Sequence, residues 1–318
     1  MNIKLSVIVT SIIGLLFIKI FFQNHVSQKS LSAFRTSQGQ ALFLEAYYAS
    51  MKQLPKPSKQ GRIKTSYGEV QYYLYEHPTQ KKAPLLLLPG RHSGAPMWEA
   101  NIKELIQERT VILIDSIGDS GLSRQTKAIQ NSREQAQWIH EFIKKLELGP
   151  VHSVGHSFGG WLASNHAIHY PEDIQTLSLL EPVFVIEGLK PMIFLKSIPA
   201  SLPFLPKKFK ENLLKEISGS SEVDLEDPVA RMICYSSEYF QVKLPMPDLI
   251  TGESLNQIKH PIYIRVADQS NLHNSEKIVK KGLNDIENVD IKNWKNATHS
   301  LPMEYPEEIS KELINFTQ

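Results

Sequence analysis

The sequence of 318 residues contains a single cysteine, Cys234. A lone cysteine excludes an intramolecular disulfide and a metal site built from cysteine ligands. The sequence also has almost no net charge, because 35 lysines and arginines are balanced by 33 aspartates and glutamates. A charge balance this close to neutrality gives no electrostatic support for nucleic-acid binding, and we expect no nucleic-acid partner.

Common cofactor and metal motifs are missing as well. The sequence has no Walker-type phosphate loop, no His-Glu-x-x-His and no Gly-x-Gly-x-x-Gly. His166 and His169 are spaced like metal ligands on a helix, but no third ligand accompanies them, so we interpret both as structural. The sequence therefore predicts no metal and no cofactor. Its length fits one large α/β domain, or a domain with an appendage.

Long apolar runs are confined to the amino terminus, where residues 5–22 are interrupted only by Lys19 and a few small polar residues. As a helix this run would be about 27 Å long, close to the hydrocarbon core of a bilayer. A cleaved signal peptide is the alternative, but the best cleavage candidate, at 30–32, lies too far downstream. We expect residues 1–31 to form an uncleaved single-pass anchor. Basic residues flank both ends of the run, so the membrane side of residues 32–318 stays undecided.

After this segment, short apolar runs alternate with helical stretches, which predicts a doubly wound, mostly parallel α/β sheet. The expected strands are 62–66, 70–76, 85–88, 111–114, 151–154, 177–180, 262–266 and 289–294. The expected helices are 32–52, 96–107, 133–146, 160–169 and 306–316. Residues 184–260 interrupt the alternation with prolines and apolar clusters, which predicts a helical cap over the carboxyl edge of the sheet. A decorative insertion with its own small core is the alternative.

The segment Gly155-His156-Ser157-Phe158-Gly159-Gly160 lies between an expected strand and an expected helix. A Gly-x-Ser-x-Gly in this context is a nucleophile elbow, a sharp turn that lifts a serine hydroxyl above a parallel sheet. Side chains at the two flanking glycines would collide with the neighbouring strand and helix. The motif predicts Ser157 as a nucleophile and His156 as a residue that packs beside the site.

Four segments together resemble the α/β-hydrolase superfamily, and more closely its carboxylesterase-like members with a helical cap. They are Leu88-Pro89-Gly90 followed by Met97-Trp98, the turn 115–121, the elbow, and Ala297-Thr298-His299. The resemblance extends from about residue 61 to the carboxyl terminus. It implies the α/β-hydrolase fold and a catalytic triad in the chain order serine, acid, histidine.

The resemblance assigns the other two members of the triad. His299 is the expected base, because the family places its histidine in the loop before the last helix. Asp268 is the favoured acid because it follows the expected strand 262–266, although Arg265 stands where the family usually has glycine. Glu181 occupies the alternative acid position that some relatives use, directly after the preceding strand.

The tetrahedral intermediate of ester cleavage needs two preorganised N–H donors for its oxyanion. The resemblance places them on the backbone of Phe158 and Arg91. The family usually has His-Gly where this sequence has Pro89-Gly90, and His92 is a candidate replacement for the missing imidazole. The donors belong to the main chain, so we expect the oxyanion hole to persist.

These residues predict a membrane-anchored serine hydrolase that cleaves carboxylic esters through an acyl-enzyme. An amide or N-terminal peptide hydrolase with the same triad is one alternative, and acidic residues of the expected cap could hold its substrate amine. They are Glu187, Glu211, Glu216 and Asp224. A non-catalytic, membrane-tethered binding module is the other. Apolar cap segments favour an ester with an apolar part, and the basic cluster 207–210 either contacts anionic headgroups or forms a solvated helix face.

Overall fold

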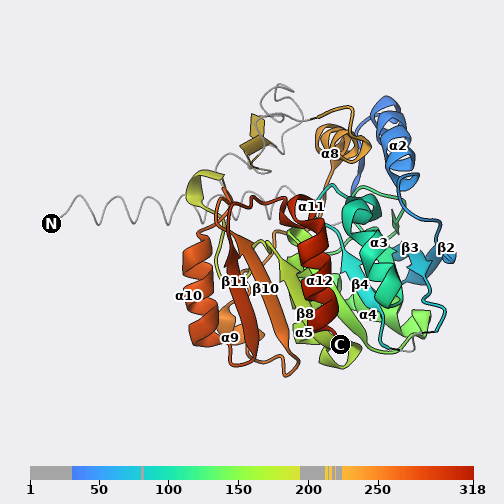
Figure 1. The fold of residues 1–318 in the computed structure, drawn as a ribbon. Coiled ribbons are helices and arrows are strands. Elements are labelled where there is room, and N and C mark those ends of the chain that lie inside the picture. Colours follow the sequence, from blue (N-terminus) through green and yellow to red (C-terminus); the bar gives the residue numbers. More distant parts are fainter. Residues whose placement is uncertain (1–30, 80–81, 194–211, 214, 217–218, 220–223) are drawn as a thin grey trace.

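The computed structural model describes residues 31–318 apart from 80–81, 194–211, 214, 217–218 and 220–223. In this part of the chain a nine-stranded sheet has the order β11-β10-β8-β7-β4-β5-β3-β2, with β6 paired to β3 (Figure 1). The strands are β2 (Lys59–Thr65), β3 (Gly68–Tyr75), β4 (Leu85–Leu88), β5 (Val111–Ile114), β6 (Arg124–Gln125), β7 (Val151–His156), β8 (Ile174–Leu180), β10 (Ile262–Ala267) and β11 (Val289–Trp294).

The six strands from the β11 edge to β5 are parallel, as the continuous apolar runs predict. All four residues of β4 and of β5 are buried, and the expected bounds of these two strands and of β11 are confirmed. From β4 the chain builds β5 on one side and then returns to build β7 on the other. Such a switch point opens a crevice at the carboxyl ends of the strands, where a site is expected.

Helices cover both faces of the sheet (Figure 1). One face carries α4 (Ser132–Leu146), α5 (Phe158–His169), α9 (Gly252–Leu255) and α10 (Ser275–Asp285). The other carries η1 (Ala95–Trp98), α3 (Glu99–Glu108), α11 (Leu301–Glu304) and α12 (Pro306–Phe316). The expected α/β-hydrolase arrangement is therefore present, and the expected helix 306–316 has the predicted bounds.

The helix expected at 32–52 is present as α2 (Ser37–Met51). It packs mainly on the insertion. Its partner is α8 (Pro228–Tyr239), and both stand above one end of the sheet (Figure 1). Phe43, Tyr47 and Met232 form the small core between them. Strand β1 (Ala33–Phe34) also pairs with β9 (Phe240–Gln241) in a separate ribbon.

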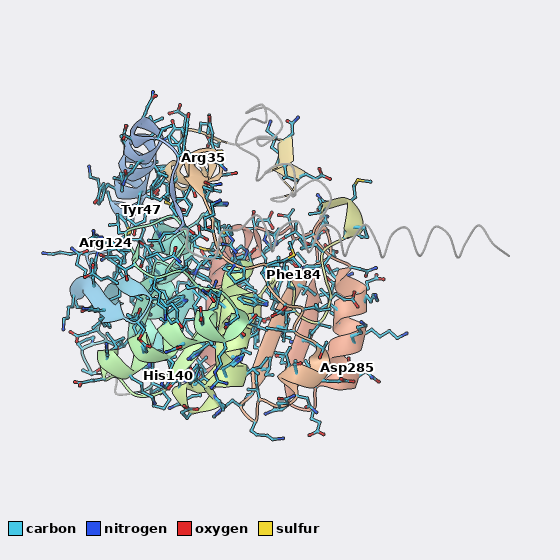
Figure 2. The ribbon with its side chains drawn as sticks, turned by 180° about the vertical axis from the view of Figure 1, so that it is seen from behind. Arg35, Tyr47, Arg124, His140, Phe184 and Asp285 are labelled. Carbon is cyan, nitrogen blue, oxygen red and sulfur yellow. The ribbon has the colours of Figure 1, made fainter. Side chains whose placement is uncertain are left out.

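One buried carboxylate ties α2 to the sheet. Asp115, directly after β5, accepts hydrogen bonds from the Tyr47 hydroxyl at 2.8 Å and from the backbone N–H groups of Ala95 and Leu122 at 2.8 and 2.7 Å. Burial raises the pKa of Asp115 to about 6 in spite of these donors. Figure 2 shows Tyr47, a residue of α2, at one end of the sheet and His140 at the opposite end.

Several expectations concern segments outside the described residues. The expected anchor at 5–22 and the basic cluster at 207–210 both lie there. Among the residues that the structure describes, no helix has the length and apolar character needed to cross a bilayer. The end of the insertion belongs to the main domain, because Leu255 and Ile258 lie in the core beneath the sheet. That the remainder of 184–260 forms a cap stays a prediction.

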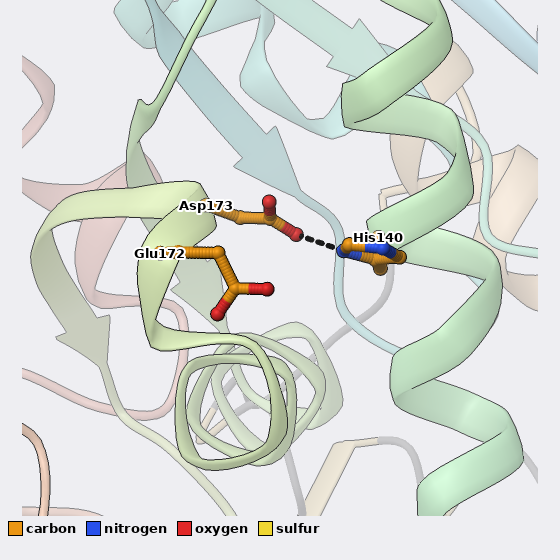
Figure 3. Close-up of side chains that lie close together, drawn as sticks. All are labelled: His140, Glu172 and Asp173. Atoms are coloured by element: carbon orange, nitrogen blue, oxygen red, sulfur yellow. Dashed lines mark hydrogen bonds and ion pairs between the residues drawn. The ribbon is translucent and has the colours of Figure 1, made fainter.

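At the amino-terminal edge of the sheet, three basic side chains contact the carboxylate of Asp173. His140 Nδ1 lies 2.7 Å from Asp173 Oδ2 (Figure 3), His166 Nε2 lies 3.0 Å from the same oxygen, and Lys144 Nζ lies 2.9 Å from Oδ1. Burial alone would raise the pKa of Asp173, but these partners lower it to about 2. The contacts support the interpretation of His166 as structural, because they join α4, α5 and the turn before β8.

We expect Asp173→Asn to lower the free energy of unfolding at pH 7 by about 2 kcal/mol, because it weakens three bonds to a buried charge. The pKa of Asp173 is lowered on folding, so its contribution is complete above the ordinary value of 3.8 and is lost as the pH falls towards 2. Urea unfolding should therefore show the difference from wild type shrinking between pH 4 and the lowest pH at which the fold survives. Glu172→Gln, which changes the exposed neighbouring carboxylate, is the matched control and should stay within about 0.5 kcal/mol of wild type. A pH-independent deficit in Asp173→Asn would contradict the assignment.

Candidate active site

The turn between β7 and α5 holds Ser157 in a backbone conformation that few non-glycine residues adopt. Its φ is 54° and its ψ is −119°. Such strain persists only where the surroundings fix it. Here the Ser157 N–H donates to the carbonyl of Leu180 at 3.0 Å, and the Ser157 carbonyl accepts from Gly160 at 3.0 Å and Val183 at 3.3 Å. The expected nucleophile elbow is therefore present.

Close backbone contacts explain why the motif needs glycine on both sides of the serine. A Cβ on Gly155 would lie 2.2 Å from the carbonyl oxygen of Gly159, and a Cβ on Gly159 would lie 2.2 Å from that of Leu88. Both obstacles are backbone atoms, which cannot rotate away. Only glycine allows β4, β7 and α5 to approach closely enough to form the turn.

A continuous hydrogen-bond chain runs from Ser157 through His299 to Glu181. His299 Nε2 lies 2.9 Å from Ser157 Oγ, and His299 Nδ1 lies 3.0 Å from Glu181 Oε2. A carboxylate oxygen only accepts, so Nδ1 carries the proton and Nε2 is free to accept the proton of the serine hydroxyl. Glu181 is fully buried and His299 is 7% exposed. The structure thus joins the serine and histidine selected from the sequence.

The acid favoured from the sequence does not reach His299. Asp268 follows β10 as expected, but its carboxylate faces Lys295, whose Nζ lies 3.9 Å from Asp268 Oδ2. The structure therefore does not place Asp268 against His299 as the sequence led us to expect; Glu181, the alternative position, makes that contact. The unusual Arg265 is directed elsewhere: its guanidinium is within 3.0 Å of both Asp290 and Glu312.

Glu181 is held as an anion in spite of its burial. Burial alone would raise the pKa of its carboxyl, but the contacts with His273 and His299 outweigh burial and hold the pKa well below the usual range. Its Oε1 accepts the backbone N–H of Ala267 at 2.5 Å. Glu181 also has a positive φ of 49°, so β7 and β8 are each followed directly by a residue with positive φ.

The expected oxyanion donors, Arg91 and Phe158, belong to two different loops, one after β4 and one after β7. Phe158 is the first residue of α5, where an N–H has no acceptor inside the helix. In the other loop, the Gly90 N–H donates to Met97 Sδ and the His92 N–H to Asp119. In the described part of the chain, nothing accepts from the Arg91 N–H between them.

The two loops that carry these donors are in contact. The Arg91 guanidinium lies over the Phe158 ring at 3.7 Å from its centroid. A Cβ on Gly90 would lie only 3.3 Å from Ser157 Cβ, so this loop lies directly beside the nucleophile. The loop that carries Arg91 and the start of α5 therefore meet next to the nucleophile.

His156 and His92 also lie near the site, and each has a structural partner. His156 Nε2 donates to the carbonyl of His299 at 2.8 Å and so fixes the histidine loop to the elbow. Burial, with the nearby His299, lowers the pKa of His156 to about 3, so it stays neutral. His92 Nδ1 contacts Ser236 Oγ of α8 at 2.8 Å, and burial lowers its pKa to about 4. His92 therefore joins the oxyanion loop to the insertion.

Two further residues emerge only from the structure. Asp119, in the turn 115–121, accepts the His92 N–H at 3.3 Å and so contacts the oxyanion loop. His273, buried beside the triad, has its Nε2 3.3 Å from Glu181 Oε2. Its only sequence signal is its position after the last long strand, which does not distinguish it from a surface histidine. An aligned serine, imidazole and buried carboxylate can perform acyl transfer.

Comparison with known proteins agrees with this geometry. The sequence profile of the alpha/beta hydrolase fold family matches residues 83–226. The carboxylesterase YbfK of Bacillus subtilis (strain 168) is 23% identical over 282 residues, which cover 86% of this chain and 93% of that protein. A monoacylglycerol lipase of Bos taurus is 25% identical over 260 residues, covering 74% of this chain and 75% of that protein.

Solved structures share the fold over most of the chain. The crystal structure of carboxylesterase CesB (YbfK) from Bacillus subtilis has a TM-score of 0.80 at 21% identity and covers 88% of this chain and 98% of its own. A crystal structure described as a membrane phospholipase A, a bacterial virulence factor, has a TM-score of 0.69 at 17% identity and covers 96% and 97%.

The elbow geometry predicts that one added methyl group at Gly159 strongly lowers the free energy of unfolding. We expect Gly159→Ala to destabilise the fold by about 3 kcal/mol or more, because the added Cβ meets a carbonyl of β4. Gly188→Ala is the matched control, since a Cβ there has nothing within 4 Å and the backbone has an ordinary φ. Thermal and urea unfolding of the two variants should separate them clearly. Equal stability of the two would contradict the close approach of α5 to β4.

Proposed function

Because this chain belongs to the α/β-hydrolase fold family as a carboxylesterase-like member, we propose that it is a serine hydrolase that cleaves carboxylic esters with Ser157, His299 and Glu181 as its triad. The observation that carries the proposal is the unbroken hydrogen-bond chain from Ser157 Oγ through both nitrogens of His299 to the Glu181 carboxylate. It has the connectivity that nucleophilic catalysis by serine requires.

In the first half of the reaction, His299 Nε2 removes the Ser157 hydroxyl proton as Oγ attacks the ester carbonyl. The negative charge moves to the carbonyl oxygen, which accepts from the N–H groups of Arg91 and Phe158. The imidazolium is stabilised by the Glu181 carboxylate 3.0 Å from Nδ1. When the C–O bond breaks, Nε2 returns its proton to the alcohol that leaves. In the second half, water repeats the sequence and releases the acid from Ser157.

Two observations favour an ester substrate with an apolar part. The relatives at 23% and 25% identity are named as a carboxylesterase and a monoacylglycerol lipase. The insertion also carries exposed apolar side chains, including Met192, Met246 and Leu249, which are 60%, 49% and 49% exposed. For the peptidase alternative, Glu187 is a poor amine ligand because Lys277 and Lys281 already contact its carboxylate.

We further propose that residues 5–22 anchor the enzyme to a membrane. The support is the length and apolar character of the run, together with the fold shared with a structure described as a membrane phospholipase. An anchored hydrolase would meet lipophilic esters at the bilayer surface. Recovery of the full chain from the soluble fraction after lysis without detergent would contradict this proposal.

We expect Ser157→Ala to abolish labelling by a fluorophosphonate probe and to lower the turnover of p-nitrophenyl esters by about 10⁴-fold or more. The substitution removes the atom that carries the acyl group. Ser153→Ala is the matched control, since Ser153 is a buried serine of β7, the strand that leads into the elbow. The wild type should prefer longer acyl chains over acetate. Retained labelling of Ser157→Ala would contradict the nucleophile, and activity confined to amino-acid arylamides would favour the peptidase.

The choice of acid is tested by two amide substitutions of equal size. We expect Glu181→Gln to lower turnover by about 10⁴-fold, because an amide NH₂ facing Nδ1 favours the tautomer that cannot accept the serine proton. Asp268→Asn should stay within about twofold of wild type, because no contact joins Asp268 to His299. The measurement is the kcat of both variants on one soluble ester. If Asp268→Asn lowers kcat more than Glu181→Gln does, Asp268 and not Glu181 is the acid of the triad.

A further inference from the structure

We propose that His273 is a positioning residue for the triad, which holds the Glu181 carboxylate against His299. This inference rests on the proposed ester hydrolysis. His273 does not touch the reacting atoms; its action on them passes through Glu181. The segment after β10, expected to supply the acid, instead fixes an acid that comes from the neighbouring strand.

The carboxylate of Glu181 is contacted on both oxygens. Oε1 accepts the Ala267 N–H at 2.5 Å. Oε2 has two imidazole neighbours, His299 Nδ1 at 3.0 Å and His273 Nε2 at 3.3 Å. A carboxylate oxygen has two lone-pair directions, so one atom can receive both imidazoles. Ala267 and His273, at the two ends of one short segment, therefore contact both oxygens of the acid.

His273 has no other evident polar role in the part of the chain that the structure describes. Its side chain is 2% exposed, and neither ring nitrogen has a hydrogen-bond partner apart from the 3.3 Å contact with Glu181. A buried imidazole with unsatisfied nitrogens is costly, and a hydrophobic side chain would fill the same space without that cost. The contact with the carboxylate is the feature that only a polar side chain provides.

The segment that carries His273 is itself fixed at several points. The Leu272 carbonyl accepts the backbone N–H of Lys190 at 2.7 Å. Asn274 caps α10 by accepting the Lys277 N–H at 3.0 Å, and the Ser275 hydroxyl donates back to the Ala267 carbonyl. These bonds fix the main chain on both sides of His273, so its ring reaches Glu181 from a rigid support.

The consequence is a carboxylate that is already oriented when charge develops on His299. A buried anion with fewer donors could rotate its terminal torsion and lose the contact with Nδ1. With Ala267 on one oxygen and His273 on the other, that rotation would break a favourable contact at each end. Electrostatic stabilisation is most effective when the stabilising group needs no rearrangement during the reaction. Loss of His273 should therefore reduce kcat and leave substrate binding nearly unchanged.

The test compares His273→Leu with His273→Gln in the full-length protein. We expect His273→Leu to lower kcat for a soluble p-nitrophenyl ester by about 10- to 100-fold, with KM within about twofold of wild type. His273→Gln presents an amide N–H in the same region and should recover most of the loss. The matched control is His152→Leu, since His152 is a buried histidine of β7 bonded to Thr176 at 2.9 Å. It should change the melting temperature without a comparable change in kcat.

A double-mutant cycle distinguishes a role of His273 in positioning Glu181 from a role in packing alone. In the Glu181→Gln background, His273→Gln and His273→Leu should cause little further loss of kcat, because the carboxylate through which His273 acts is gone. Independent, multiplicative losses would overturn the inference, as would an unchanged kcat in His273→Leu or equal losses in the Leu and Gln variants. If His273→Leu fails to fold, the same cycle is run with His273→Met, which likewise offers no N–H to Glu181 and should show the same loss only when the carboxylate is present. Failure of phosphonate labelling at Ser157 in wild type would instead overturn the proposed function.

Discussion

The left-handed backbone of Ser157 is the constraint on which the site depends. It exists because Gly155 and Gly159 let β7, β4 and α5 approach to distances that any Cβ would prevent. Hydrogen bonds to and from Leu180, Gly160 and Val183 fix the turn from several sides. The hydroxyl is thereby raised above the carboxyl edge of the sheet, in contact with His299. The strain is local, and the packed sheet that surrounds it supplies the compensating stability.

A buried charge is the second requirement. Glu181 can remain ionised in a fully enclosed position only because an amide and two imidazoles contact its oxygens. Such an arrangement needs groups from β8, from the segment after β10 and from the loop after β11. The acid is therefore a property of three neighbouring strand ends acting together. The proposed role of His273 follows from that shared arrangement.

The insertion is connected to the site through the oxyanion loop. His92 contacts Ser236 of α8 through its ring and Asp119 through its backbone N–H. The same α8 packs against α2, which Tyr47 fastens to the buried carboxylate of Asp115. The chain segment that follows the expected anchor is thus packed on the part of the insertion nearest the catalytic loops. Displacement of α2 or α8 would be transmitted to the loop that carries the Arg91 N–H.

The sequence by itself determined the parallel strands, the nucleophile elbow at Ser157 and the histidine loop at His299, because each depends on a local pattern: an apolar run, a pair of glycines, a position before the last helix. It favoured Asp268 over Glu181, although both follow parallel strands that end at the same edge of the sheet. Which carboxylate reaches His299 depends on three-dimensional packing, and only the tertiary structure shows that Glu181 does. The contact of His273 with Glu181 could not be predicted from the sequence either, because it joins residues that follow two different strands and meet only in the folded chain.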